Sequence, residues 1–515
     1  MVKKRTHSRK SNGWHNRRVS SEWPSPFQQV APPPPPPAAP AGRSTPDWLL
    51  AGGVVIAAIA LVAVLGLIVW TSLNPTPTAS LAPSPTQVAV TTTPPAPTAT
   101  SRPSTSTTSP SAIPSATPIS GTSGPGSLAT VPPEIAAQID QVVAQMPAIR
   151  ELDELRDVPY NLISREQFQI DLRALVDEEI DLDLVAAQSR ALERLGLLPE
   201  GSDLYQMSLD LNGGGISAYY RFDNREFYII ERNQPFGPLE RVFVAHEYTH
   251  ALQDQHFNLV ENRITDPSEG DAALAELAVI EGDASTAMLS WATQNLSVDE
   301  LIEVIRSAAI GTDQQLLDRM PPILVRQLSF PYQEGQAFVT ELQQLSGWQA
   351  VDQAIQDPPP TTEQILHPEK YAAHEEPAAV LVDDVAEQLG DGWEQAYIDT
   401  FGEVNMQVLA AAGVPPVDGF PGSPPTYPHS ETVDGWNGDR FAMWEGPAEA
   451  WAIAWVTAWD TATDADEFAG RLAELESTFG GFVRITRGAD VVVTLLLASD
   501  PALLDLVNAN IGRGR

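Results

Sequence analysis

The stretch "VFVAHEYTHALQDQHF", Val242–Phe257, holds three histidines, one glutamate and one aspartate in an otherwise mostly uncharged run. Within it, residues 246–250 read H-E-Y-T-H and fit the pattern H-E-x-x-H. On a helix, positions i and i+4 lie about 40° apart on one face, so the side chains of His246 and His250 can reach one Zn²⁺. Glu247 lies about 100° from His246 and is placed to act as the base for a water on that metal.

A third protein ligand must come from outside this pair. His256 has the spacing of the pattern H-E-x-x-H-x-x-G-x-x-H, but Gln253 stands where that pattern turns the chain with glycine. Glu281 is the preferred ligand, because it sits within an apolar run, where a buried carboxylate needs a cation. Glu269 reads as an acid in the first turn of a helix, and Glu276 is a further, weaker alternative.

With His246, Glu247, His250 and the later Glu281, the sequence resembles the gluzincin class of zinc metallopeptidases. It looks most like membrane-anchored or secreted members with the arrangement "HEYTHALQDQHF … EGDA", and the resemblance covers roughly residues 215–375. The resemblance implies a gluzincin-like zinc metallopeptidase domain with two histidines and a glutamate as ligands. It also implies a zinc-bound water that attacks a peptide carbonyl.

Two features beside the second ligand helix carry further expectations. Thermolysin-like members have an aspartate that supports a histidine four residues after the ligand glutamate, and here that position is Ser285. Asp283 or Asp254 is the candidate for that supporting role. Gly282 is expected to let the helix that carries Glu281 approach the motif helix closely.

Peptide hydrolysis also needs a donor for the developing oxyanion. The segment "TTEQILHPEKY" supplies His367 and Tyr371 as the preferred candidates, with Tyr332 as an outside candidate. Lys370 lies in the same segment and is the single lysine after residue 133. The stretch "AYYRFDNREFYIIE" reads as a hairpin, whose edge either pairs with an extended substrate or packs as ordinary sheet.

The N-terminal part of the chain predicts a membrane anchor. Residues 48–70 form an uncharged apolar run of bilayer-spanning length with tryptophan at both ends. Residues 1–47 are basic and proline-rich and predict a disordered cytoplasmic tail, which orients the bulk of the chain outside. Residues 71–133 are nearly all Ser, Thr, Pro and Ala and predict an extended disordered stalk.

The remainder predicts a mainly helical α+β protein in two parts. We expect a zinc metallopeptidase domain over residues 134–425, in which residues 134–210 are candidates to cover the cleft. Alternating strand and helix patterns predict a small α+β module over residues 426–515.

Composition excludes some classes of function. The formal net charge is −37 although residues 1–47 are basic, so the outer part is strongly acidic and should not bind nucleic acid. The chain has no cysteine, which excludes disulfides, cysteine metal sites and a cysteine nucleophile.

The sequence therefore predicts a single-pass cell-membrane protein with an extracytoplasmic zinc-dependent metallopeptidase domain that acts on peptides or proteins. One alternative is a catalytically inactive binding or structural protein on the same fold. Another is a zinc hydrolase of a non-peptide amide or ester. The sequence does not predict the oligomeric state.

Overall fold

The computed structural model describes residues 131–512, except 180, 216, 233–234, 260–263, 265, 312–313, 418–425 and 489–490. The predicted cytoplasmic tail, the apolar span at 48–70 and all but the last residues of the predicted stalk lie outside this range. Among the residues described, no helix combines the length and the apolar character needed to cross a membrane.

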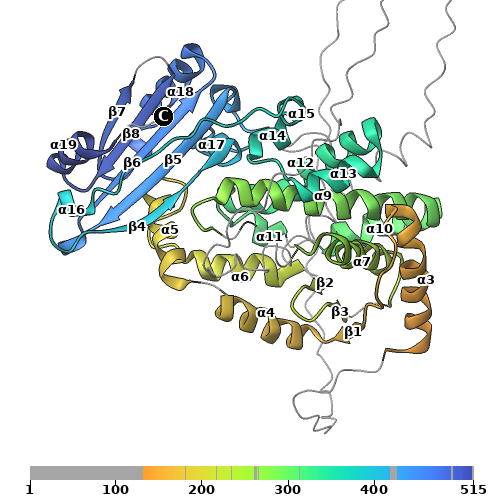
Figure 1. Cartoon of the computed structure of the whole chain (residues 1–515). Helices are drawn as coiled ribbons and strands as arrows, with labels where there is room; N and C mark the ends of the chain where they lie inside the picture. The colour runs from red at the N-terminus through yellow and green to blue at the C-terminus, as the bar shows by residue number, and fades with distance from the viewer. Residues whose placement is uncertain are drawn as a thin grey trace, which may run out of the picture.

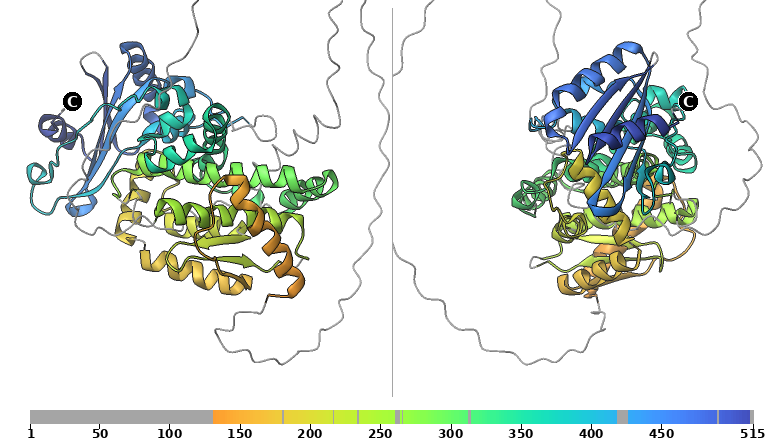
Figure 2. Two further views of the ribbon diagram at one scale, coloured as in Figure 1. Left: turned by 45° about the vertical axis from the view of Figure 1, so that its right-hand side comes forward. Right: turned by 90° about the vertical axis from the view of Figure 1, so that its left-hand side faces the viewer.

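A mainly helical body packs beside a five-stranded antiparallel sheet, which confirms the predicted α+β class (Figures 1 and 2). The helices of the body are α3 (Pro133–Arg150), α4 (Arg165–Glu179), α5 (Leu182–Arg194), α6 (Leu204–Gly215), α7 (Pro238–Phe257), α9 (Gly270–Asn295), α10 (Val298–Gly311), α11 (Gln314–Leu317), α12 (Pro322–Ser346), α13 (Trp348–Gln356), α14 (Thr362–Leu366), α15 (Pro368–Ala372) and α17 (Gly402–Ala410).

A small sheet in the body contains the predicted hairpin. The strands β2 (Ala218–Arg221) and β3 (Glu226–Ile230) pair in antiparallel register, and β1 (Tyr160–Ile163) adds to β3 in parallel. The order β1-β3-β2 leaves β2 at an edge, and this strand packs against α7. The sequence did not predict β1, since a four-residue strand gives too little alternation to recognise.

The motif helix α7 lies at the centre of the body. Its first turn is closed by Glu240, whose Oε2 accepts a hydrogen bond from the Gly237 N–H at 2.8 Å. It ends at Asn258, whose positive φ of 51° turns the chain out of the helix. Burial on nearly all sides explains why this helix lacks a polar face.

Helix α9 runs beside α7 and also packs closely on α12. A Cβ atom on Gly282 would lie 2.3 Å from the carbonyl oxygen of Gly335, and a Cβ on Gly335 would lie 2.2 Å from that of Ala278. Only glycine permits this backbone contact. The expectation that Gly282 lets its helix approach the motif helix was therefore wrong, because Gly282 permits the close approach of α12 instead.

The C-terminal sheet has the order β4-β5-β6-β8-β7. Its strands are β4 (Glu394–Asp399), β5 (Trp436–Glu445), β6 (Trp451–Trp459), β7 (Phe482–Arg487) and β8 (Val492–Ala498), with the helices α16 (Ala386–Leu389), α18 (Ala462–Glu474) and α19 (Pro501–Asn510). Alternate residues of β5, β6 and β8 enter two apolar clusters, one on each face. Because β4 belongs to the sheet, the sheet begins before residue 426, where the sequence placed the start of the module.

Candidate metal centre

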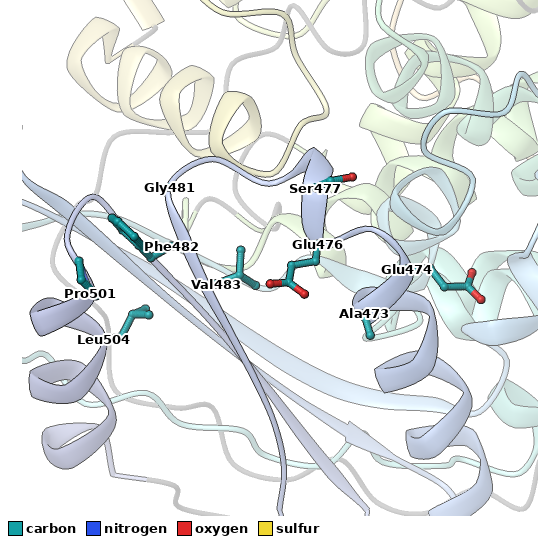
Figure 3. Close-up of a pocket in the computed structure, with 9 residues that line it drawn as sticks. All are labelled: Ala473, Glu474, Glu476, Ser477, Gly481, Phe482, Val483, Pro501 and Leu504. Atoms are coloured by element: carbon teal, nitrogen blue, oxygen red, sulfur yellow. The ribbon is translucent and has the colours of Figure 1, made fainter.

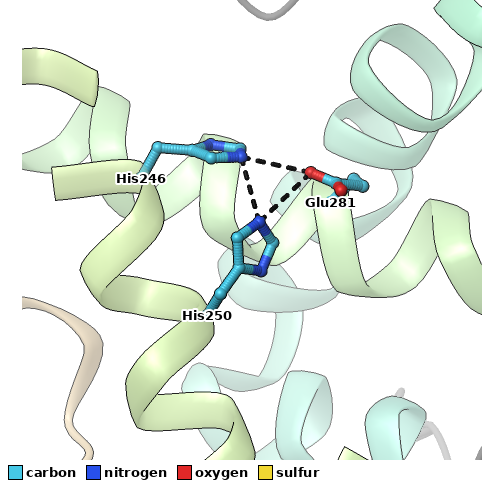
Figure 4. A group of neighbouring side chains, drawn as sticks. All are labelled: His246, His250 and Glu281. Atoms are coloured by element: carbon cyan, nitrogen blue, oxygen red, sulfur yellow. Dashed lines mark hydrogen bonds and ion pairs between the residues drawn. The ribbon is translucent and has the colours of Figure 1, made fainter. Parts of the chain in front are cut away.

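The side chains of His246, His250 and Glu281 converge between α7 and α9 (Figure 4). The Nε2 atoms of the two histidines are 3.1 Å apart. Glu281 Oε2 lies 3.1 Å from His246 Nε2 and 3.4 Å from His250 Nε2. None of the three residues is more than 2% exposed. The two residues from the motif and the glutamate preferred from the sequence therefore form one buried group.

The spacing of these atoms fits a tetrahedral metal ion. Ligand bonds of about 2.0–2.2 Å with tetrahedral angles put neighbouring ligand atoms about 3.3 Å apart. The three observed separations, 3.1, 3.1 and 3.4 Å, bracket that value. Two imidazole nitrogens and one carboxylate oxygen are also a donor set that suits Zn²⁺. These residues could therefore hold a metal ion.

A hydrogen bond on the far side of His250 prepares its Nε2 atom for a metal. Nδ1 of His250 lies 2.9 Å from Gln253 Oε1. The amide nitrogen of Gln253 is committed elsewhere, to the Ile280 carbonyl at 2.9 Å and to Asp283 Oδ2 at 2.8 Å. Gln253 Oε1 is thus an acceptor and His250 carries a proton on Nδ1, which leaves Nε2 facing the other two side chains, where it binds a second proton or a metal ion.

The electrostatics of the group favour a positive charge at its centre. Burial opposes the charged forms of Glu281 and His250, but the attraction between these two side chains outweighs the effect of burial. That attraction raises the pKa of His250 to about 9 and, together with His246, lowers the pKa of Glu281 to about 2. No arginine or lysine in the described part of the chain pairs with Glu281, so the compensating cation must be a proton or a metal ion.

Glu247 lies beside this group, against the edge strand β2. Its carboxylate accepts a hydrogen bond from the backbone N–H of Tyr220, and burial raises its pKa, an increase that the two histidines offset only in part. The Oε1 atom of Glu247 is buried and meets no hydrogen-bonding partner among the residues described. A carboxylate oxygen in that position is available to accept a proton from a water beside the metal ligands.

Tyr332 of α12 closes the other side of the group. Its ring centroid lies 6.2 Å from that of His246, and the side chain is 1% exposed. Burial raises the pKa of Tyr332 well above its ordinary value, and the nearby carboxylates of Glu281 and Glu247 add to that increase. The hydroxyl faces Glu281 but is outside hydrogen-bonding geometry to the described residues. The outside candidate from the sequence therefore borders the metal group, which consists of His246, His250 and Glu281.

The alternative third ligands lie elsewhere. His256 is on the continuing helix α7 and contacts the Asp153 carbonyl at 2.7 Å. Glu269 stands at the N-cap position of α9, and its carboxylate pairs with Arg440 at 3.2 Å. Glu276 accepts a hydrogen bond from the Ile264 N–H at 3.0 Å.

The two residues preferred from the sequence as oxyanion donors are not brought to the metal group. His367 pairs with Glu403 at 3.3 Å, and the Tyr371 hydroxyl donates to the Asp357 carbonyl at 3.3 Å. Their segment meets α9 near its start, where the Thr362 hydroxyl donates to Asp271 at 2.6 Å. Asp271 lies ten residues before Glu281, which is about 15 Å along the helix. This distance separates the segment from the metal ligands.

Of the two predicted supporting carboxylates, Asp283 reaches a ligand histidine through Gln253, whereas Asp254 does not face the ligands. Asp254 accepts a hydrogen bond from the Tyr220 hydroxyl at 3.0 Å and thereby ties β2 to α7. Gln253 was not predicted from the sequence as a functional residue. The available signal was its position three residues after His250, on the same helical face.

Two surface cavities lie apart from this group. One, of about 720 Å³, is lined by Phe482, Val483 and Leu504 of the C-terminal module (Figure 3). The other, of about 770 Å³, is lined by residues near the ends of β1 and β3, including Arg165 and Arg232. Neither cavity is lined by a metal-group residue.

Comparison with known proteins bears on the C-terminal part alone. Residues 388–497 match the family model of a domain of unknown function, DUF8575, which spans most of the five-stranded sheet and excludes the metal group. No curated protein and no solved structure matches the chain significantly. The matched residues amount to less than half of the chain, so its similarity to a known family is confined to this C-terminal domain of unknown function.

Proposed function

We propose that this protein is a zinc-dependent metallopeptidase whose ligands are His246, His250 and Glu281. The observation that carries the proposal is the spacing of the three ligand atoms, which fits a tetrahedral ion, with the Glu247 carboxylate close enough to interact with all three residues. Zn²⁺, when bound, supplies a Lewis acid that polarises a carbonyl and lowers the pKa of a water.

The residues of the chain take defined roles in this proposal. Oε1 of Glu247 accepts a proton from the attacking water and returns it to the leaving nitrogen. The Tyr332 hydroxyl donates a hydrogen bond to the carbonyl oxygen as negative charge develops there. His367 and Tyr371, the donors preferred from the sequence, remain predictions that the contacts described above do not support.

The strand β2 is the proposed docking edge for the substrate backbone. It is the outer strand of its sheet, and its Tyr220 N–H already points out of the sheet to Glu247. An extended peptide that pairs with this edge runs past the metal ligands, which favours a peptide or protein substrate. Because the ligands are no more than 2% exposed, substrate entry requires the elements that cover them to open.

The location follows from the sequence and is part of the proposal. The span at 48–70 anchors the chain in the cell membrane, with the basic N-terminus cytoplasmic and the metallopeptidase domain outside. Protease added to intact cells should cut the stalk and release the domain. Complete protection of the domain from the protease would show that the domain lies on the cytoplasmic side instead.

The test of catalysis is the Glu247→Gln substitution. The variant should bind zinc as the wild type does, because Glu247 is not a ligand, and should lose at least about 100-fold in peptide hydrolysis. The measurements are zinc content by elemental analysis and cleavage of a peptide library. Equal cleavage by the two proteins would refute the proposal that Glu247 acts as the base.

The burial of the metal group favours a second candidate, a binding or structural protein in which the ion only stabilises the fold. If this candidate is correct, the wild-type protein should bind one zinc ion per chain and should not hydrolyse peptides or esters. If the protein is instead a zinc hydrolase of other amides or esters, it should hydrolyse small esters and should not hydrolyse peptides. Zinc content, peptide cleavage and small-ester hydrolysis by the wild-type protein together separate the three functions.

A further inference from the structure

Arg150, the last residue of α3, is a buried arginine at the back of the metal group. It is 0% exposed, and its Nε donates to Asp283 Oδ1 at 2.5 Å. Its Nη2 atom donates to Asp352 Oδ1 of α13 at 2.6 Å, and the guanidinium carbon lies 4.5 Å from the ring centroid of Trp348. A cation enclosed in this way has a fixed position.

The contacts continue from Arg150 to a metal ligand without interruption. Asp283 uses Oδ1 for Arg150 and Oδ2 for the amide nitrogen of Gln253, at 2.8 Å. Gln253 Oε1 then lies 2.9 Å from His250 Nδ1. Arg150, Asp283, Gln253 and His250 therefore form a single buried relay that joins α3, α9 and α7.

The charges in this relay decide how the Gln253 amide is oriented. In the observed orientation the amide donates to the carboxylate and to the Ile280 carbonyl, and it accepts from the imidazole. The flipped amide would turn its oxygen toward two acceptors, the Asp283 carboxylate and the Ile280 carbonyl, which is unfavourable in a low-dielectric interior. The negative charge on Asp283 therefore selects the useful orientation, and Arg150 balances that charge.

We infer that Arg150 is a positioning residue for the metal: through Asp283 and Gln253 it holds the Nδ1–H of His250 and so aims Nε2 at the ion. This inference rests on the proposed metal site. Ligand histidines commonly depend on such supporting groups, whose loss weakens metal binding by about 10–100-fold. What is particular here is that the outermost member comes from α3, outside the region of the gluzincin resemblance.

The test is the zinc affinity of Arg150→Met, measured by competition with a chelator of known affinity. We expect affinity about 10–100-fold below wild type. A second readout is the imidazole Nδ1–H proton of His250 by NMR in the zinc-loaded protein. Wild type should show a proton protected from exchange, and Arg150→Met should lose that protection. A merely structural role would lower stability without changing this signal.

Two further variants keep the test decisive. Arg326→Met removes another buried arginine, one that pairs with Glu334 and does not contact the ligands, so it should lower stability but leave zinc affinity unchanged. If Arg150→Met does not fold, the double variant Arg150→Met/Asp283→Asn avoids leaving one buried charge alone. It should still show weaker zinc binding and a less protected Nδ1–H proton.

The outcomes separate this inference from the proposed function. Wild-type affinity and an unchanged Nδ1–H signal in a folded Arg150 variant would overturn the positioning role and leave the metal site intact. Failure of the wild-type protein itself to bind zinc would overturn the metal site, and with it the inference.

Discussion

The metal group and the cluster around Lys370 each gather three residues with ligand-type atoms, but only the second contains a lysine or arginine. In that cluster, the Lys370 ammonium lies 2.6 Å from Glu363, 3.0 Å from Glu375 and 2.8 Å from Asp460. In the metal group, the described contacts of Glu281 are to histidines and a tyrosine. The chain thus supplies a lysine ammonium in one place, whereas the other place depends on a proton or a metal ion for its positive charge.

A third region shows another solution to the same electrostatic problem. Asp399 at the end of β4 is 9% exposed and accepts hydrogen bonds from the Gly270 N–H at 2.8 Å and from the Tyr397 hydroxyl at 2.7 Å. Burial, with a smaller contribution from Asp439, raises its pKa to about 7. Buried carboxylates in this protein are therefore neutralised by a lysine, by a proton, or, as we propose for Glu281, by a metal ion.

The largest expected effect is on the metal group. Glu281→Ala should reduce zinc binding by more than about 100-fold, because it removes the single anionic ligand. His256→Ala should leave zinc content unchanged, since His256 contacts Asp153 instead. Elemental analysis of the purified variants tests both. The reverse result would mean that the third ligand has been misassigned.

An intermediate effect is expected for the lysine cluster. Lys370→Met should lower the free energy of unfolding by about 3 kcal/mol, because it leaves the carboxylate of Glu363, which is 4% exposed, without a cation. Denaturant titration measures the loss. The double variant Lys370→Met/Glu363→Gln should recover part of it, and no recovery would show that charge is not what matters at this cluster.

The smallest expected effect is a pH dependence from Asp399. Its folded-state pKa is raised to about 7, so its contribution to stability is complete below its unfolded pKa and is lost as pH rises through about 7. Between pH 5 and pH 8 the free energy of unfolding should fall by on the order of 2 kcal/mol. Asp399→Asn should flatten this dependence, whereas Asp466→Asn, at an exposed carboxylate, should not.

Part of the candidate site could be predicted from local sequence. The spacing of His246 and His250 fixes their shared face on any helix, since the helical period does not depend on the rest of the fold. Glu281 could be chosen over Glu269 because an apolar run predicts burial, and a buried carboxylate needs a partner. The choice between His367 and Tyr332 as oxyanion donor could not be made this way.

The fold shows the same division. The strands β5, β6 and β8 were readable because long apolar and alternating runs mark buried strands. The six residues of β4, among helices in the sequence, gave no such pattern, and their pairing with β5 is a contact across about forty residues. A short strand of this kind can be identified only from the strand with which it pairs in the folded protein.

The sequence by itself determined the H-E-x-x-H helix, the buried glutamate that follows it and the α+β class, because these depend on periodicity and on the cost of burying charge. Only the tertiary structure decided that Tyr332 borders the ligands and that Arg150 stands behind His250. Arg150 and Asp283 are 133 residues apart in the chain. Their contact depends on how α3, α7 and α9 pack together, and no local pattern encodes that packing.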